Sequence, residues 1–160
     1  MGSMITKVKE SISRVAFNVS NYTGLTPRFA LTVYRDYGDK FRHQNWDFCT
    51  GDVLETTLAS VTAVTTTSIT LDGPEDCFGG LWNAVNKHSW TTPARMILWM
   101  GDAPQHGSLY NGGLGDNYPE GDPEGRTATE LFQLLQEKRI TLVFCKLTNQ
   151  TDAMILQISN

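Results

Sequence analysis

The sequence predicts an α/β fold in which helices alternate with buried strands. Two near-continuous apolar runs, residues 94–102 and 140–148, are typical of buried strands. Segments with apolar residues at helical spacing stand on both sides of them. The chain has 160 residues, of which 40% are hydrophobic and 19% charged, which is ordinary for one globular domain. Because neither an internal repeat nor a dividing linker is visible, we expect a single domain over residues 1–160.

The first half of the chain predicts a helix, a hairpin and a second helix. Apolar residues recur at steps of three and four over Ile5–Val19, as on one face of an amphipathic helix. The β-rich run 28–36 ends at a turn, and residues 43–50 alternate weakly, so the two segments could pair as a hairpin. A helix over residues 52–64 follows, because Asp52 and the glutamate three residues later have capping-box spacing.

The second half continues the alternation. A helix is expected to start near Pro74, a residue that suits the first turn. After the strand over 94–102, a long loop rich in Gly, Pro and acidic residues extends to about Arg126. A helix over 127–139 then begins with Thr127 and Glu130 at capping-box spacing. The second apolar strand and a last helix over 151–159 complete the pattern.

Charge and hydropathy exclude several classes of function. The formal net charge is −4 and no run of Lys or Arg stands out, so we expect no nucleic-acid partner and no membrane-surface partner. No apolar stretch approaches the ~20 residues that span a bilayer, and the N-terminus lacks a signal-peptide pattern. Three widely spaced cysteines, without a close pair, fit a reducing compartment. The expected location is therefore the cytoplasm.

One apolar strand ends in a single carboxylate. The stretch "WMGDAP" leads directly to Asp102, and ligands of parallel sheets bind at the carboxyl ends of strands. Asp102 is therefore either a metal or substrate ligand, or a residue that caps the loop by accepting backbone N–H bonds.

Four motifs in order resemble one family. They are "YRDYGD" (34–39), "DGPEDCFGGL" (72–81), "GDAPQHG" (101–107) and "YPEGDPEG" (118–125). Together they are similar to the von Willebrand factor A (VWA) domain, in the intracellular branch associated with α-kinases, over about residues 4–155. The resemblance implies a doubly wound, mostly parallel sheet with helices on both faces, which is a VWA/Rossmann-like fold.

The resemblance also implies a metal-ion-dependent adhesion site. In the family this site combines a D-x-S/T-x-S motif after the first strand, a residue from a second loop and an aspartate from a third. Asp102 is similar to the third-loop aspartate, while Asp72 and Glu75 fall where the second loop should approach the metal. Oxygen ligands of this kind suit Mg²⁺. Without a metal, Asp72 would belong to a simple Asp-Gly turn.

The chain also departs from the family. The usual first strand and its aspartate motif are missing, so the expected fold is truncated and the metal site is degenerate or incomplete. We expect that no ion is bound, with Mg²⁺ as the candidate if one is. The sequence "MGSM" either starts just past that motif or carries a cloning remnant before Met4. In place of a Gly-rich approach to the second loop stands "TTTSITL" (65–71). The match also stops before the family's last strand and helix.

Loss of a central strand would leave unpaired backbone groups at the sheet edges. Three outcomes follow: the strands after residues 28 and 94 pair directly, another chain donates a strand, or the edges stay exposed. We expect direct pairing or a homodimer formed through the exposed edges.

Other polar residues favour structural roles. The four acids of the loop 115–125 do not follow the order of an EF-hand loop, so we expect a solvated, turn-rich surface. His43 and His106 have no partner at zinc-ligand spacing and are expected to be structural or exposed. Trp82, Trp90 and Trp99 are expected in the core or at an interface.

Neither a nucleophile elbow nor a Walker A loop is present in the sequence, so we expect no enzyme. The leading hypothesis is a non-catalytic protein-interaction domain with an incomplete metal-ion-dependent adhesion site. The alternatives are a Mg²⁺-dependent ligand-binding module completed by a strand from another chain, and a metal-dependent hydrolase. The residues expected to contact a protein partner are Asp102, His106, Tyr110, Asp116 and Tyr118.

Overall fold

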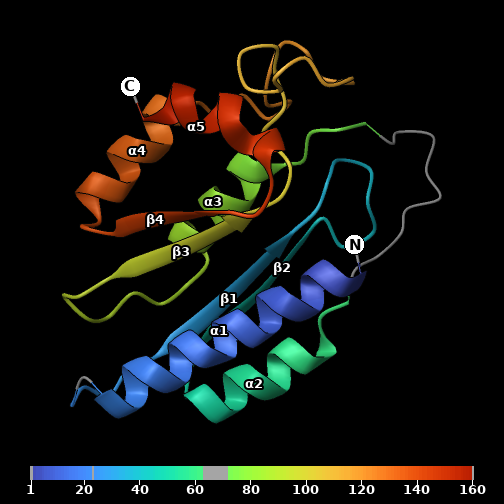
Figure 1. Cartoon of the computed structure of the whole chain (residues 1–160). Helices are drawn as coiled ribbons and strands as arrows, with labels where there is room; N and C mark the ends of the chain where they lie inside the picture. The colour runs from blue at the N-terminus through green and yellow to red at the C-terminus, as the bar shows by residue number, and fades with distance from the viewer. Residues whose placement is uncertain (1, 23, 63–71, 160) are drawn as a thin grey trace. The chain divides into compact units, whose positions relative to one another are not determined.

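The computed structural model describes residues 2–22, 24–62 and 72–159, and shows a mixed α/β chain (Figure 1). The elements, in chain order, are α1 (Gly2–Tyr22), β1 (Phe29–Tyr34), β2 (His43–Cys49), α2 (Gly51–Ser60), α3 (Cys77–Asn86), β3 (Met96–Gly101), α4 (Ala128–Glu137), β4 (Thr141–Lys146), a 3₁₀ turn (Asn149–Thr151) and α5 (Asp152–Ile158). The type and order of the predicted elements are therefore confirmed.

The expected continuous, doubly wound sheet is not what the described residues form. They contain two separate two-stranded sheets, β1 with β2 and β3 with β4. β3 and β4 are parallel, with Met96 opposite Thr141 and Gly101 opposite Lys146. The short loop 35–42 between β1 and β2 permits only an antiparallel pair. The strands after residues 28 and 94 are β1 and β3, and the described residues show no pairing between these two strands. Instead, β1 pairs with β2, and β3 pairs with β4.

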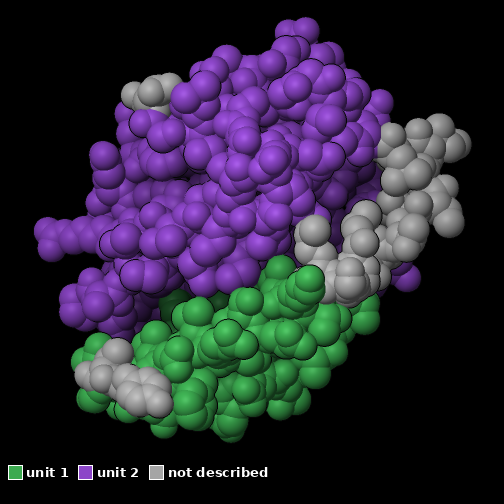
Figure 2. All heavy atoms as spheres, in the orientation of Figure 1, with its two compact units in different colours: residues 1–31, 46–66 green, residues 32–45, 67–160 purple. Residues whose placement is uncertain are grey.

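The chain divides into two compact units, coloured separately in Figure 2. Unit 1 comprises residues 1–31 and 46–66, and unit 2 comprises residues 32–45 and 67–160. The prediction of one domain over the whole chain stays a prediction. Unit 1 buries Ala16 of α1 against Leu54 and Leu58 of α2, with Phe29 packed beside them. Of the apolar face predicted for the first helix, Ile12 packs against this small core, whereas Val15 is exposed.

Unit 2 has the larger core. It contains Phe78 from α3, Trp99 from β3, Leu131 from α4 and Met154 from α5, and each of these side chains is buried. The expectation that the tryptophans serve the core is confirmed, since Trp82 and Trp90 pack against this cluster. Cys77 at the start of α3 belongs to the same core and is fully buried.

Gly80 of α3 faces the ring of Tyr34. A Cβ atom at this position would lie 2.5 Å from ring atoms of Tyr34, so only glycine allows this approach. The Tyr34 hydroxyl accepts a hydrogen bond from Trp99 Nε1 at 3.1 Å. The end of β1 is thereby fixed against α3 and β3 within unit 2.

Two helix starts differ from the sequence prediction. α3 begins at Cys77 rather than near Pro74, because the Asp76 side chain caps it by accepting the backbone N–H of Gly79 at 2.9 Å. α2 begins at Gly51 with Thr50 as its N-cap residue rather than Asp52. α2 also ends at Ser60, earlier than the predicted residue 64, since Val61 is extended. Residues 63–64 and the segment 65–71 lie outside the described residues.

α4 confirms its predicted capping box. The Thr127 side chain accepts the backbone N–H of Glu130, whose carboxylate accepts the backbone N–H of Thr127. Across the described helices, we find none with both the length and the apolar character that crossing a membrane requires.

Candidate functional site

Three loops of unit 2 meet at one edge: the β1–β2 loop, the segment before α3 and the long loop after β3. Backbone hydrogen bonds join the second and third of these segments, and the side chains of Asp36 and His106 connect the first to the third. Glu75 N donates to Pro104 O at 2.9 Å, and Gly73 N donates to Gly115 O at 3.0 Å. Glu75 also forms an isolated parallel bridge with Gln105. Because these bonds join segments distant in sequence, their polar side chains converge. We call this region the loop edge.

The three predicted metal ligands all belong to the loop edge. Burial raises the pKa of Glu75 to about 8, and the nearby carboxylates of Asp36, Asp39 and Asp102 add to the effect. Burial also raises the pKa of Asp72, although the backbone N–H of Asn117 opposes it by donating to Asp72 Oδ2 at 2.6 Å. A cation beside these groups would offset the repulsion between them.

Two buried carboxylate oxygens at the loop edge have no hydrogen-bond partner among the described residues. They are Asp72 Oδ1 and Glu75 Oε2. Buried polar atoms are nearly always paired, so such atoms call for an explanation. Asp102 is half-exposed and directly follows β3, where its sequence position predicts it. The predicted ligands thus belong to one edge, but in the described residues the ligand atoms of Asp72, Glu75 and Asp102 do not all lie within 4.8 Å of one another, and their metal-binding role stays a prediction.

His106 is the centre of a second cluster, which the sequence did not indicate. Its side chain is fully buried, so the structural interpretation is confirmed and the exposed one is wrong. Nδ1 lies 2.8 Å from Asp116 Oδ1, and Nε2 lies 2.6 Å from Asp36 Oδ1. Burial alone would lower the pKa of His106, but the hydrogen bonds to both carboxylates outweigh it and raise the pKa to about 9.

Asp116 is held by several donors. Its carboxylate accepts the backbone N–H of Gly107 at 2.7 Å and of Tyr118 at 2.8 Å, and the Asn111 amide at 3.1 Å. Burial opposes ionisation, but His106 and these donors outweigh it and lower the pKa of Asp116. The carboxylate is therefore an acceptor that orients the imidazole.

The residues predicted to contact a partner lie at different depths. The side chains of His106 and Asp116 are 0% and 3% exposed, so a partner would meet the loop that they hold rather than the two side chains themselves. Tyr110 and Tyr118 are half-buried, with the Tyr110 ring packed on Phe78 at 5.2 Å between centroids. Asp102 is half-exposed. Their roles in binding stay predictions.

The loop 115–125 is less solvated than the sequence predicts. Asp122, like Asp116, has a buried side chain, whereas Glu120 and Glu124 are exposed. Arg126 explains the burial of Asp122, since its Nε lies 2.5 Å from Asp122 Oδ2. Hydrogen bonds from Arg126 and Tyr37 outweigh burial and lower the pKa of Asp122. Both residues lie in a loop, where the four-residue spacing of paired charges on a helix does not apply, so their spacing did not indicate this pair.

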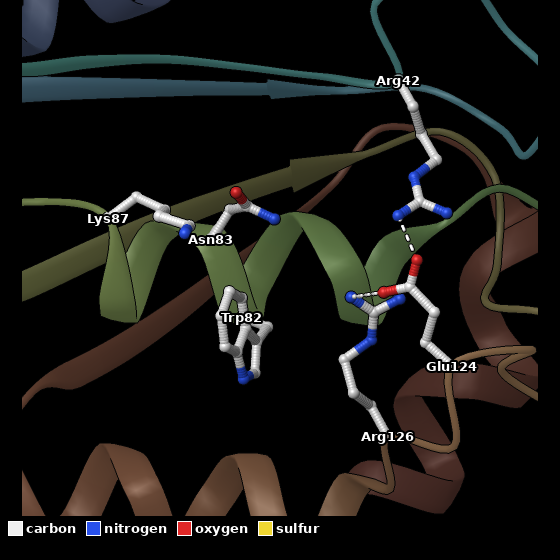
Figure 3. A pocket seen from close by; sticks show the side chains of 6 residues that line it. All are labelled: Arg42, Trp82, Asn83, Lys87, Glu124 and Arg126. Carbon is white, nitrogen blue, oxygen red and sulfur yellow. Dashed lines mark hydrogen bonds and ion pairs between the residues drawn. The ribbon is translucent and has the colours of Figure 1, made fainter.

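Arg126 also reaches Asp76, the buried cap of α3. Its Nη2 lies 3.3 Å from Asp76 Oδ1, and Arg42 Nε lies 3.3 Å from Asp76 Oδ2. His43 is structural as well, because its Nε2 lies 2.8 Å from the same oxygen of Asp76. In Figure 3 the guanidinium groups of Arg42 and Arg126 both face the carboxylate of Glu124 across a surface pocket. Sequence reasoning missed this ionic network, because its members are far apart in the chain.

Comparisons with known proteins give one partial likeness. The chain is 42% identical over 62 residues to the α-protein kinase vwkA of Dictyostelium discoideum. That match covers 38% of this chain and 10% of the kinase, so the chain corresponds to a small part of it. A search of family models finds no match, and none of the solved structures matches. Over these 62 residues, the likeness to this kinase agrees with the expected resemblance to domains associated with α-kinases.

Proposed function

We propose that this chain is a non-catalytic, VWA-like protein-interaction domain that binds its partner through the loop edge. The observation that carries the proposal is that Asp72 and Glu75, from the segment before α3, and Asp102, which follows β3, belong to the same loop edge. Asp72 Oδ1 and Glu75 Oε2 are buried there and have no hydrogen-bond partner among the described residues. The partial likeness to an α-kinase supports the same family. A doubly wound sheet would then require strands beyond the two pairs that the described residues form. The three free cysteines are compatible with a cytoplasmic location, which we also propose.

The carboxylates of the loop edge are of the chemical kind that suits Mg²⁺, and an ion would have to draw Asp72, Glu75 and Asp102 closer together than they stand. Asp72, Glu75 and Asp102 would hold the ion through carboxylate oxygens, the ligands that this cation prefers. Bound Mg²⁺ would supply an open coordination position for a carboxylate of the partner. Three carboxylates leave several coordination positions of Mg²⁺ to water, so we expect the affinity for the ion to be weak.

The test is calorimetric titration of Mg²⁺ and Mn²⁺ into the chain and into two variants. Asp102→Ala removes a proposed ligand, and Glu120→Ala removes an exposed acid of the loop after β3 as a matched control. Saturable heat that Asp102→Ala loses and Glu120→Ala keeps would support a cation site. A bound ion should raise the free energy of unfolding by about 2.7 kcal/mol at a hundredfold excess over Kd. No saturable heat would reject the cation.

A second measurement addresses protein binding. An array of peptides with acidic side chains is probed with the chain in Mg²⁺ and in EDTA, with Asp102→Ala as the comparison. Binding that requires both Mg²⁺ and Asp102 supports a cation-bridged interaction. Binding that survives EDTA but not substitution of Asp102 supports the loop edge without a cation. If no variant changes the binding, the loop edge is not the binding surface.

The β3–β4 pair favours a second candidate, completion of the sheet by another chain. One face of this pair exposes Met96, Leu98 and Val143, and Leu98 is the register partner of Val143. Exposed apolar strands promote pairing with another chain. Sedimentation over a range of concentrations should then show a dimer that Leu98→Lys disrupts. A monomer at all concentrations would contradict a homodimer.

A further inference from the structure

We propose that Asp36, Asp72 and His106 form a binding site for a divalent transition metal, of which Zn²⁺ is the best fit. Asp116 acts as a positioning residue that holds His106 in the ligating orientation. The proposal concerns a different ligand set from the Mg²⁺ site, with which it shares only Asp72. It rests on the geometry of the His106 cluster and holds whether or not the loop edge binds a protein.

The three side chains can each offer one ligand atom to a common position. These atoms all lie within 4.8 Å of one another. The side chains are well shielded, with exposed fractions of 14% for Asp36, 5% for Asp72 and 0% for His106. One imidazole nitrogen with carboxylate oxygens is a donor set that suits Zn²⁺ and related metals better than Mg²⁺.

Asp116 determines which nitrogen of His106 faces the site. Because the Asp116 carboxylate already accepts hydrogen bonds from Gly107, Tyr118 and Asn111, it acts as an acceptor toward Nδ1 at 2.8 Å. Nδ1 is therefore the donor, and Nε2 is directed at Asp36 Oδ1, 2.6 Å away. Histidines that bind metals are commonly held in this way, by a carboxylate on the nitrogen that does not ligate.

Asp72 provides an independent indication of a cation site. Its side chain is 95% buried, and Oδ1 has no hydrogen-bond partner among the described residues. One carboxylate oxygen of Asp72 and one of Asp36 lie within 4.8 Å of each other. Two carboxylates this close repel each other, and a cation bound between them would offset that repulsion. Asp36 is itself fixed by its own turn, since its Oδ1 accepts the backbone N–H of Tyr37 at 2.6 Å.

Nε2 of His106 lies 2.6 Å from Asp36 Oδ1, so a metal ion would have to enter between these two atoms. Zn²⁺ binds the unprotonated nitrogen, so any proton on Nε2 would pass to solvent, while Nδ1 keeps its hydrogen bond to Asp116. Ligand distances of about 2.0–2.2 Å to nitrogen and oxygen require Nε2 and Asp36 Oδ1 to separate to about 3.4 Å in a tetrahedral site. That is a small opening for two side chains.

The experiment is a titration of the chelator-stripped chain with Zn²⁺, and with Co²⁺ as a spectroscopic probe, in a reducing buffer. We expect saturable binding, a rise in the melting temperature with Zn²⁺ and a visible absorption band with Co²⁺. Asp36→Asn should abolish all three. Asp116→Asn should weaken binding by about 10- to 100-fold, as loss of such a positioning carboxylate does elsewhere.

Asp102→Asn is the variant that separates this proposal from the Mg²⁺ site. Zn²⁺ binding that is retained in Asp102→Asn but lost in Asp36→Asn supports the proposed ligands. Equal binding in the parent chain and Asp36→Asn overturns it and indicates adventitious ions, for example on a half-exposed cysteine. The absence of saturable Zn²⁺ binding also overturns the proposal, since the cluster then binds no metal ion. Circular dichroism in the presence of chelator verifies that each variant is folded. If Asp36→Asn does not fold, His106→Gln replaces it as the variant that lacks a ligand.

Discussion

Replacing Arg126 by methionine removes the guanidinium group that pairs with the buried carboxylates of unit 2. Arg126 Nη2 donates to the Tyr37 hydroxyl at 2.7 Å, and its Nε lies 2.5 Å from Asp122 Oδ2. Asp76 and Asp122 both have fully buried side chains. Methionine keeps an apolar stem of similar length, so the substitution tests the charge more than the packing.

The expected cost follows from what remains around each carboxylate. Asp76 keeps Arg42 and His43, while Asp122 keeps the Tyr37 hydroxyl at 2.6 Å and the backbone N–H of Glu124 at 2.8 Å. Removing one partner of a buried ion pair costs about 3–5 kcal/mol. Because both carboxylates retain other partners, we expect the lower end, about 3 kcal/mol. That corresponds to a fall in melting temperature of about 6–12 °C for a chain of this length.

Urea unfolding followed by tryptophan fluorescence measures this cost, because three of the four tryptophans, Trp82, Trp90 and Trp99, belong to unit 2, and Trp46 belongs to unit 1. Glu124→Gln is the matched control. It removes another partner of Arg126, but its side chain is 47% exposed, so we expect a loss below about 1 kcal/mol. If Arg126→Met costs no more than Glu124→Gln, the buried network does not stabilise the fold as we infer.

Three further substitutions test other parts of unit 2 by the same unfolding assay. Thr127→Ala removes the capping box of α4 and should cost about 1 kcal/mol; an unchanged midpoint would contradict the role of the cap. Gly80→Ala places a Cβ 2.5 Å from the Tyr34 ring and should cost about 1–3 kcal/mol, whereas Gly115→Ala meets nothing within 4 Å and should cost less. The folded-state pKa of Asp122 lies below its ordinary value, so its stabilisation is complete above about pH 4 and is lost as the pH falls through the folded-state pKa. The acid-induced loss of stability should therefore be smaller in Asp122→Asn, and an equal loss in both chains would argue against the shift.

Local patterns predicted the elements of the chain well. The apolar run 94–102 became β3, and the capping-box spacing at Thr127 and Glu130 was confirmed in full. Such signals succeed because hydrophobic periodicity and capping act between residues close together in the sequence. α3 starts three residues later than predicted. Pro74 suits a first helical turn, but the side chain of Asp76 caps the helix, so the helix begins directly after Asp76.

Contacts between distant segments could not be predicted in the same way. His106 and Asp36 are 70 residues apart, and no spacing rule joins them. Asp122 was expected at the surface because acidic, turn-rich loops usually are solvated, but Arg126 compensates its charge and allows burial. The convergence of Asp72, Glu75 and Asp102 followed from the family resemblance, since composition alone does not specify which loops meet.

The burial of Cys77 makes the thiol a built-in reporter of core opening. Thiol reagents attack the thiolate, and burial raises the pKa of this thiol well above its ordinary value, so the closed core protects Cys77 from alkylation. Cys49 and Cys145 are half-exposed and should be alkylated first. The rate at which a third alkyl group is added, followed by mass spectrometry, would therefore measure how often the core of unit 2 opens under native conditions. No substitution is needed for that measurement, because the natural sequence already contains the probe.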